Sequence, residues 1–362
     1  MFFYVILRYI CRKRLRKTLN MARKLTMKDI AERLNISITT VSRALNNKSD
    51  IGESTRKAVL ELAKEYDYSP NAIASSLRKS KSNLIGVVLP RLEHYFFSTV
   101  LKGIVSYAQK DDYIVSVGES GHNPKRESEL IEHFIGMNVS GIILAPCRNE
   151  INISYVNALK QNNIPLILID RIPKNFEGNY VQLNDFHGGQ MAVRHLISQG
   201  YKKIAHIKGH EYSSIAEARF QGYLYALKLH NYEFNPAMVK TCEFVSAEEG
   251  YYFTKELMLS ANKPDAIFTV TDEVALGVYE ALKELDLKIA EDIGVVGFSN
   301  SMVSNYLCPR LTTIDQPGER IGENAYEFLR NSLEQNDTVF QKVFEAKLLI
   351  RESSVRTVHN GK

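Results

Sequence analysis

The chain has 362 residues, which is too long for one ordinary hydrophobic core and favours at least two domains. With 44% hydrophobic and 24% charged residues it has the composition of a globular protein, which excludes the disordered and fibrous classes. The four cysteines show no C-x-x-C spacing, so we expect neither a disulfide framework nor a zinc site, and a reducing cytoplasm is the natural inference. They are Cys11, Cys147, Cys242 and Cys308. We also expect no cofactor.

Positive charge is concentrated near the N-terminus. Residues 1–80 carry seventeen Lys and Arg against seven Asp and Glu, a net charge of +10, and the rest of the chain carries −5. A basic head on an acidic body is typical of a nucleic-acid-binding protein. The alternative is that the charges only keep the surface of the head soluble. The apolar run within residues 1–20 is too short to span a bilayer and precedes its basic residues, unlike a secretory signal. We therefore interpret residues 1–23 as a disordered or wrongly included extension, with Met21 as an alternative start, and expect no membrane anchor.

The sequence predicts a helix-turn-helix after this extension. Thr26 and Asp29 form a capping-box signature, and apolar residues follow at helical spacing. Asn35 is placed where a left-handed residue would turn the chain, and Ser37 would cap a second helix that runs to about Leu45.

The second helix is predicted to have one apolar face and one polar, cationic face. At 100° per residue, its core-facing residues are Val41, Ala44 and Leu45. The outward face and its flank carry Ile38, Thr39, Ser42 and Arg43. A third helix is predicted over residues 52–66, with a core-facing stripe of Val59, Leu62, Ala63 and Tyr66. Three such helices would hold the second one against DNA.

The segment LTMKDIAERLNISITTVSRALNN resembles the opening of the LacI/GalR repressor family, with its Thr40-Val41-Ser42-Arg43 and Asn46. The resemblance covers Leu25 to about Val355. It implies a homodimer that binds a palindromic operator in double-stranded DNA, with Arg43 as the expected reader of a guanine and a phosphate contact as the alternative role. The DNA-binding residues that it implies in the head are Thr26, Ser37, Ile38, Thr39, Thr40, Ser42, Arg43 and Asn46.

The segment AIASSLRKSKSNLIGVV resembles the hinge helix of the same family. Pro70 ends the third helix and Asn71 caps a new helix of two turns, which is too short to be stable alone and is expected to form only on DNA. The resemblance implies that Leu77 wedges between the central base pairs from the minor groove and that Ala74 lines the groove floor, with Asn71 as a further DNA-binding residue. The alternative is that Leu77 is a linker residue that packs on the core.

Strand-like and helical runs alternate beyond Asn83, and the pattern restarts after Asp185. This alternation predicts parallel sheets with helices on both faces, in two similar lobes with a cleft between them. The segment LTTIDQP, from Leu311, is expected to cross back to the first lobe. The expected fold class is an all-α three-helix helix-turn-helix head with a hinge helix, followed by an α/β two-lobed periplasmic-binding-protein-like core of type I. The expected divisions are 24–70 for the head, 71–82 for the hinge and linker, and 83–358 for the core. Within the core, lobe 1 is expected to comprise about 83–183 and 316–344, and lobe 2 about 184–312 and 345–358.

Ligands of such sheets lie at the carboxyl ends of the strands, and the residues just after the predicted strands are therefore the candidates. The aromatic residues after the first strand could instead pack within the lobe. Asp272 could instead complement the dipole of the helix that it begins, and Arg219 could instead form an ion pair between the lobes. Ser299 stands where many relatives have Asp, so the identity of the ligand cannot be carried over. The candidate effector-binding residues are His94, Tyr95, Phe96, Asp170, Arg219, Phe244, Thr271, Asp272, Ser299 and Gln316.

These features predict a cytoplasmic, nucleoid-associated transcriptional regulator, foremost a repressor, that is controlled by a small molecule. Stacking aromatic residues beside Asp170 and Arg219 favour a sugar or sugar derivative. The alternative is a purine- or nucleoside-responsive regulator of the same family. An exported sugar-binding receptor is disfavoured by the head, and an enzyme by the lack of a metalloprotease, P-loop or nucleophile-elbow motif.

Overall fold

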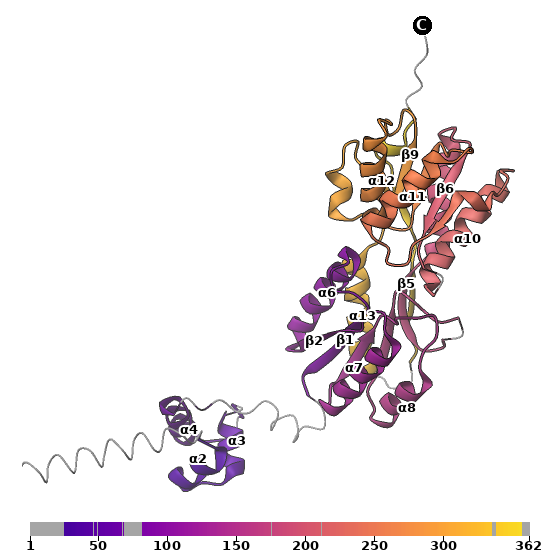
Figure 1. The fold of residues 1–362 in the computed structure, drawn as a ribbon. Coiled ribbons are helices and arrows are strands. Elements are labelled where there is room, and N and C mark those ends of the chain that lie inside the picture. The colour runs from indigo at the N-terminus through magenta and orange to yellow at the C-terminus, as the bar shows by residue number, and fades with distance from the viewer. Residues whose placement is uncertain are drawn as a thin grey trace, which may run out of the picture. The chain divides into compact units, whose positions relative to one another are not determined.

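The computed structural model describes residues 25–45, 47–48, 50–66, 68, 82–174, 176–210, 212–334 and 338–356. The chain divides into two compact units, residues 1–80 and 81–362 (Figure 1). The predicted N-terminal extension and the hinge residues Asn71, Ala74 and Leu77 lie outside the described residues. Within the described part of the chain, no helix is both long and apolar enough to span a bilayer.

The head consists of three helices around a small apolar core, as predicted. They are α2 (Met27–Leu34), α3 (Ile38–Leu45) and α4 (Glu53–Glu65). The buried core residues are Ile30, Ala31, Val41, Ala44 and Val59. The prediction for Tyr66 was wrong: its side chain is 43% exposed, and the guanidinium of Arg33 lies 4.4 Å from the centre of its ring. Tyr68 packs against the core instead.

The turn between α2 and α3 follows from local capping. The backbone N–H of Thr26 donates to Asp29 Oδ2 at 2.8 Å, and the Asp29 N–H donates back to Thr26 Oγ1 at 3.2 Å. Asn35 has the predicted left-handed conformation, with φ 49°. Ser37 Oγ accepts from the backbone N–H of Thr40 at 3.0 Å, so it caps the second helix.

The first lobe is built on a parallel sheet in the order β11-β5-β4-β3-β1-β2. Helices α6 and α13 pack together on one face, and α7 and α8 cover the other (Figure 1). The strands are β1 (Leu84–Leu89), β2 (Ile114–Glu119), β3 (Gly141–Leu144), β4 (Leu166–Ile169), β5 (Asn179–Leu183) and β11 (Gln341–Phe344). The helices are α6 (Tyr95–Ala108), η1 (Gln109–Asp111), α7 (Pro124–Gly136), α8 (Ile153–Gln161) and α13 (Gly318–Glu334).

The second lobe repeats this plan in the order β12-β10-β9-β8-β6-β7, with β12 antiparallel to β10 and the other pairs parallel. Its strands are β6 (Ile204–Lys208), β7 (Val239–Thr241), β8 (Ala266–Thr269), β9 (Gly294–Ser299), β10 (Thr312–Asp315) and β12 (Lys347–Leu349). Its helices are α9 (Asp185–Ser198), α10 (Ser214–Leu229), η2 (Pro236–Met238), α11 (Ala247–Leu259), α12 (Asp272–Glu284), η3 (Met302–Asn305) and η4 (Glu352–Ser354). The two-lobed α/β core predicted from the alternation is therefore confirmed.

The chain passes between the lobes three times: after β5, after β10 and between β11 and β12. The segment LTTIDQP from Leu311 leads back to the first lobe, as expected: Thr312–Asp315 is still a strand of the second sheet, and the crossing follows at Gln316. Because three connecting segments join the lobes, a ligand that contacts both lobes can favour one relative position of them.

Helices α9 and α10 approach each other closely through glycines. A Cβ atom on Gly222 would lie only 2.2 Å from the backbone oxygen of Phe186, and one on Gly189 would lie 2.2 Å from the backbone oxygen of Arg219. This close approach fixes α10, which carries Arg219 toward the space between the lobes.

Candidate DNA-binding face and effector pocket

The outward face of α3 presents the side chains predicted to contact DNA. Ile38 is 44% exposed, and Thr39 and Arg43 are exposed, whereas Val41 and Ala44 are buried on the opposite face. Thr40 and Ser42 are partly buried, and the Thr40 hydroxyl lies 2.8 Å from Ser37 Oγ. Thr26 and Ser37 cap their helices, so their side chains already have protein partners. Asn46 lies outside the described residues.

Arg43 forms an ion pair with Asp50, which the sequence did not indicate. Both side chains are about half exposed, and such pairs contribute roughly 0–1 kcal/mol. A base edge or a phosphate can therefore displace Asp50. Because the ion pair is weak, breaking it on DNA binding costs little free energy.

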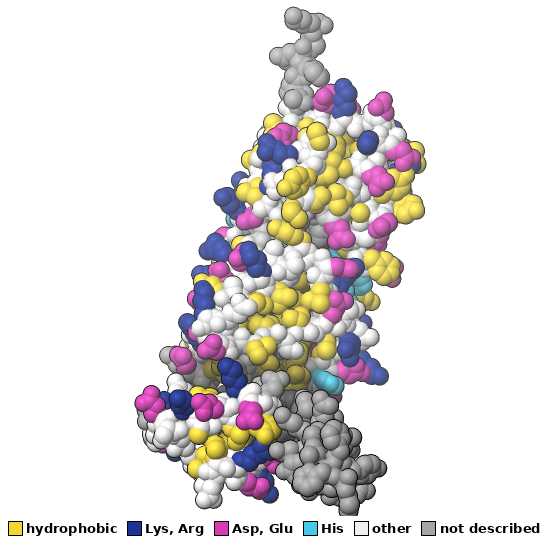
Figure 2. Space-filling model, turned by 90° about the vertical axis from the view of Figure 1, so that its left-hand side faces the viewer, with side chains coloured by type: hydrophobic (Ala, Val, Ile, Leu, Met, Phe, Trp, Pro, Cys, Tyr) yellow, Lys and Arg dark blue, Asp and Glu magenta, His cyan; other side chains and the backbone are white. Residues whose placement is uncertain are grey.

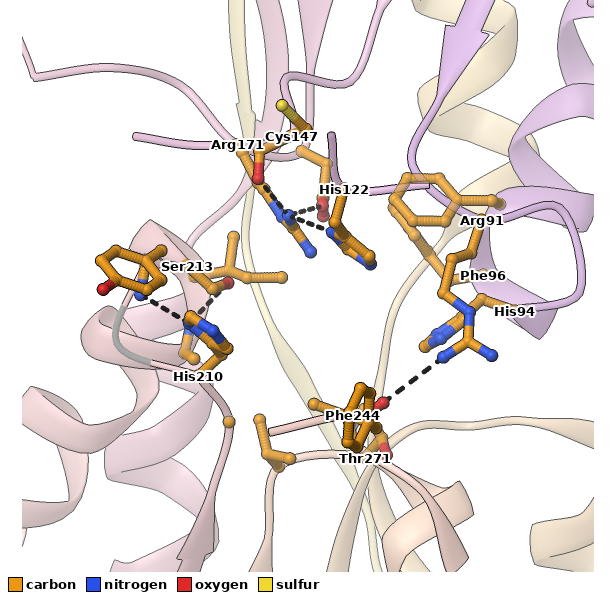
Figure 3. Close-up of a pocket in the computed structure, with 18 of the residues that line it drawn as sticks. Arg91, His94, Phe96, His122, Cys147, Arg171, His210, Ser213, Phe244 and Thr271 are labelled. Carbon is orange, nitrogen blue, oxygen red and sulfur yellow. Dashed lines mark hydrogen bonds and ion pairs between the residues drawn. The ribbon is translucent and has the colours of Figure 1, made fainter. Parts of the chain in front are cut away.

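A cavity of about 360 Å³ lies between the two lobes of the core (Figure 3). Most of its lining residues come from loops that follow β1, β2, β3 and β4 of the first sheet and β6, β7 and β8 of the second, and the others come from α6, α10, the end of β9 and the crossing after β10. This is the edge at which parallel α/β sheets bind ligands. Eight of the predicted effector-binding residues line it: His94, Phe96, Asp170, Arg219, Phe244, Thr271, Ser299 and Gln316.

Two predicted residues are not part of the lining. Tyr95 begins α6 and is 42% exposed outside the cavity. Asp272 is fully buried, where it accepts hydrogen bonds from the Ser301 N–H at 2.6 Å and from the Thr313 hydroxyl at 2.6 Å. Asp272 thus fastens the loop after β9 and strand β10 to the start of α12.

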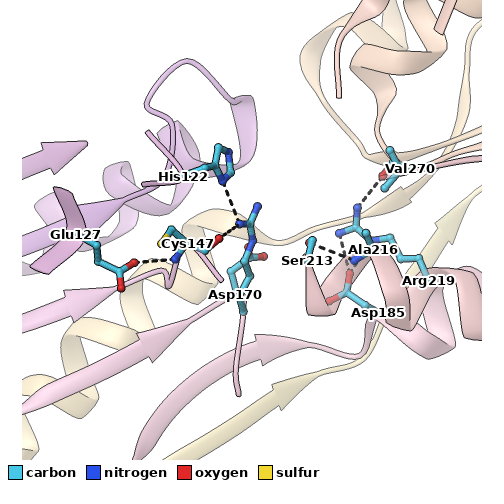
Figure 4. Close-up of polar contacts among 10 residues, drawn as sticks. His122, Glu127, Cys147, Asp170, Asp185, Ser213, Ala216, Arg219 and Val270 are labelled. Carbon is cyan, nitrogen blue, oxygen red and sulfur yellow. Dashed lines mark hydrogen bonds and ion pairs between the residues drawn. The ribbon is translucent and has the colours of Figure 1, made fainter. Parts of the chain in front are cut away.

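Arg219 reaches the cavity from a fixed position within the second lobe (Figure 4). Its Nε donates to Asp185 Oδ1 at 2.8 Å, and its Nη1 donates to the carbonyl of Val270 at 2.7 Å. The guanidinium also lies 3.5 Å from the ring centre of Phe298. An ion pair is therefore present, within one lobe rather than between lobes. Burial raises the pKa of Asp185 to about 6, against the opposing effect of Arg219.

Arg171, next to Asp170 after β4, is a pocket residue that sequence analysis missed. Its Nη1 donates to the carbonyl of Cys147 at 3.1 Å and lies 3.2 Å from His122 Nδ1 (Figure 3). The Cys147 loop is itself held by Glu127, whose carboxylate accepts from the Cys147 N–H at 2.7 Å. Loops after β2, β3 and β4 therefore meet around one guanidinium.

Two histidines of the lining are neutral near pH 7. Burial lowers the pKa of His94 to about 4, and Arg91 and Arg171 lower it further. Burial also lowers the pKa of His122 to about 4, with contributions from Arg171, His94, Arg91 and His210. Each neutral ring can donate one hydrogen bond and accept another.

A contact at the edge of the cavity joins the two lobes. Arg91, in the loop after β1, donates to the carbonyl of Phe244 in the loop after β7, over 3.4 Å. The Phe244 side chain is 65% exposed and Thr271 lies beside it in Figure 3. Behind them, Ser299 Oγ donates to Gln316 Oε1 at 2.8 Å. Both lobes therefore contribute polar and aromatic side chains to the lining of the pocket.

Five other charged or titratable lining residues that sequence analysis missed share one signal: each follows a strand of the core by two to four positions. They are Arg91, His122, Arg148, His210 and Glu243. The rule that places ligands at the carboxyl ends of strands covers all of them. Considering every charged or titratable residue in the loops after the strands would have identified these five residues.

Comparisons with known proteins agree with this architecture. Residues 26–71 match the model of bacterial regulatory proteins of the lacI family, and residues 193–354 match the periplasmic binding protein-like domain. The probable HTH-type transcriptional repressor ExuR of Bacillus subtilis is 33% identical over 91% of this chain and 98% of its own length. The ribose operon repressor of Haemophilus influenzae is 29% identical, with 91% and 98% covered.

Among solved structures, the lac repressor dimer bound to operator and an anti-inducer superimposes with a TM-score of 0.82. It is 25% identical to this chain and covers 92% of it, with all of the lac repressor chain matched. The head, the two-lobed core and these full-length similarities lead to one conclusion. The chain belongs to the lacI family of bacterial regulatory proteins and is a DNA-binding transcriptional repressor of that family.

Proposed function

We propose that this repressor binds a palindromic operator as a homodimer, and that a small carbohydrate held between the lobes of its core sets its affinity for that operator. The observation that carries the proposal is the cavity lined from both lobes. A ligand that contacts both lobes favours one arrangement of them, and it changes DNA affinity by its differential affinity for the two states. The protein would act in the cytoplasm, at the nucleoid, without catalysing a reaction.

The exposed face of α3 supports the DNA-binding part. On this face, the exposed side chains that could enter a major groove are Ile38, Thr39 and Arg43. The guanidinium of an arginine can bind a guanine through two hydrogen bonds. The similar lac repressor structure is a dimer bound to operator. Apolar side chains gather on both lobes of the face shown in Figure 2, as expected of a chain that pairs with a second copy.

The lining supports a carbohydrate more than a purine. Asp170 and His94 offer buried polar atoms for hydroxyl groups, and Phe96 and Phe244 offer ring faces for the apolar side of a sugar. A purine- or nucleoside-responsive repressor is the alternative, and relatives named PurR are 28–29% identical to this chain. Thermal shift with sugars, nucleosides and purine bases separates the two classes.

The DNA-binding part is tested by selecting bound duplexes from a random pool with the full-length protein. We expect an inverted repeat. Arg43→Ala should relax the preference at one base position in each half, at a cost of roughly 1–3 kcal/mol. An equal loss on every duplex would assign Arg43 to a phosphate. Asp50→Ala is the matched control, because it removes the ion-pair partner and leaves the reader in place.

The hinge prediction is tested separately. Leu77→Ala should weaken binding to the selected duplex and reduce DNA bending in a circular-permutation gel assay, without changing ligand affinity. Unchanged bending would exclude the wedge.

A further inference from the structure

The lining of the pocket is rich in cations. Among the described residues that line it are four arginines, Arg91, Arg148, Arg171 and Arg219, against two carboxylates, Asp170 and Glu243. Figure 3 shows Arg91, Arg171 and the histidines around the same space, contributed by both lobes. A neutral sugar has no need of this excess of positive charge.

The arginines differ in how their charge is compensated by the protein. Arg219 is paired with Asp185, and Arg91 is paired with the more exposed Glu93. Arg148 lies over the ring of Tyr212, 5.4 Å from its centre. Like Arg219, Arg171 is largely buried, with its side chain 11% exposed, but its nearest carboxylate oxygen, Asp170 Oδ2, is 3.8 Å away, whereas the Arg219 ion pair spans 2.7 Å.

Three buried polar atoms of the first lobe, on residues that line the cavity, have no hydrogen-bond partner among the residues that the structure describes. They are Arg171 Nε, Asp170 Oδ2 and His94 Nε2. Burial raises the pKa of Asp170 although Arg171 and Arg219 oppose the shift, so this carboxylate compensates the charge of Arg171 poorly. Unpaired buried polar groups are costly, and a cation more so. A ligand that supplied the missing partners would recover this free energy.

We propose that the effector is a carbohydrate that carries a carboxylate or phosphate group, with the anionic group bound by Arg171 and the hydroxyl groups bound by Asp170 and His94. The inference rests on the proposed function, of which it names the ligand class. A planar anion matches the donor fork of a guanidinium, and the hydrogen bonds are charge-assisted. Asp170 Oδ2 accepts from a hydroxyl, and neutral His94 can donate or accept.

The test is a thermal shift of the full-length protein with matched neutral and anionic sugars. The probes are D-glucose and D-ribose, D-glucuronate and D-gluconate, D-glucose 6-phosphate and D-ribose 5-phosphate, with adenine, guanine and adenosine for comparison. We expect stabilisation by at least one anionic sugar and a markedly smaller shift with its neutral parent. The carboxylate and phosphate arms show which anion the site takes.

Variants then locate the anion. Arg171→Gln should weaken binding of the stabilising probe about 10- to 100-fold in calorimetry, as expected for a lost charge-assisted hydrogen bond. Arg171→Lys should recover part of the affinity and retain the preference for the anion. Arg330→Gln is the matched control, because Arg330 belongs to α13 of the same lobe and pairs with Asp111 outside the cavity. An unchanged melting temperature of the core without ligand shows that each variant is folded.

The outcomes separate this inference from the proposed function. A neutral sugar that stabilises the protein as much as its anionic partner overturns the inference and leaves the carbohydrate effector standing. Stabilisation by the purines or the nucleoside alone overturns both. Equal binding of the anionic sugar to Arg171→Gln and wild type overturns the assignment to Arg171. The comparison of probes uses only the wild-type protein, so it holds even if a variant fails to fold.

Discussion

Replacing Arg219 with Met should destabilise the core strongly and in a pH-dependent way. The guanidinium is 1% exposed, and its contacts with Asp185, Val270 and Phe298 are within the second lobe. Met is similar in length and apolar, so the main loss is the partner of Asp185, which is itself only 5% exposed. Breaking a buried ion pair from one side costs about 3–5 kcal/mol. We expect that loss near pH 8.

The sign of the pH dependence follows from Asp185. Burial already raises its pKa to about 6 in the wild-type protein, above the value of about 3.9 for an unfolded chain. Removing Arg219 raises it further. The folded variant then binds a proton that the unfolded chain releases, so its stability is highest at low pH and falls as pH rises through the folded-state pKa. The difference from wild type should therefore shrink at pH 5.5.

The assay is urea unfolding of the full-length protein, followed by far-UV circular dichroism at pH 5.5 and pH 8. The double variant Asp185→Asn/Arg219→Met is the matched control and should recover most of the lost stability, because no buried charge is left unpaired. A loss below about 1 kcal/mol at pH 8, or the same loss at both pH values, would refute the reasoning.

Three further outcomes are expected. Ile30→Ala, in the fully buried core of the head, should lower the stability of the head by about 2–5 kcal/mol and abolish DNA binding. The ligand should still raise the melting temperature of the core, and loss of both properties would contradict two independent units. Gly222→Ala should lower the thermal stability of the core, because its Cβ would lie 2.2 Å from the backbone oxygen of Phe186. Gly52→Ala is the control and should have little effect, because the space around Gly52 is open. Equal melting temperatures for Gly222→Ala and wild type would disprove the close approach. An anion next to Arg171 should raise the pKa of His122 from about 4. With a sugar carboxylate, which stays ionised over this range, calorimetry should show proton uptake on binding and a modest rise in affinity as pH falls from 7.5 to 5.5. His122→Gln should flatten this dependence, and affinity that falls at low pH would contradict it.

Much of the fold could be predicted because its determinants are local. Thr26, Asp29 and Asn35 act within one turn of the chain, and each has the predicted capping or left-handed conformation. The core strands are short apolar runs between turn signals, and the restart after Asp185 marks the second sheet. Tyr66 was misplaced because helical periodicity cannot show that its ring stacks under Arg33 at the surface instead of joining the core.

The site was predicted less completely because its contacts join distant segments. Arg171, the Cys147 carbonyl and His122 follow three different strands, and only the sheet order brings them together. Asp272 follows its strand like the pocket residues, yet its hydrogen bonds turn it toward Thr313. Position after a strand therefore predicts proximity to the pocket, whereas the direction of a side chain depends on partners far along the sequence.

The central claim is that a ligand in the interlobe pocket sets the affinity of this repressor for its operator. The direct measurement is the Kd of the full-length protein for the selected palindromic duplex, by fluorescence anisotropy, with and without a saturating amount of the stabilising sugar. We predict a change of at least about fivefold in the wild-type protein, in line with typical allosteric coupling, and a much smaller change in Arg171→Gln at the same concentration. An unchanged Kd for the wild-type protein under saturation would contradict the account.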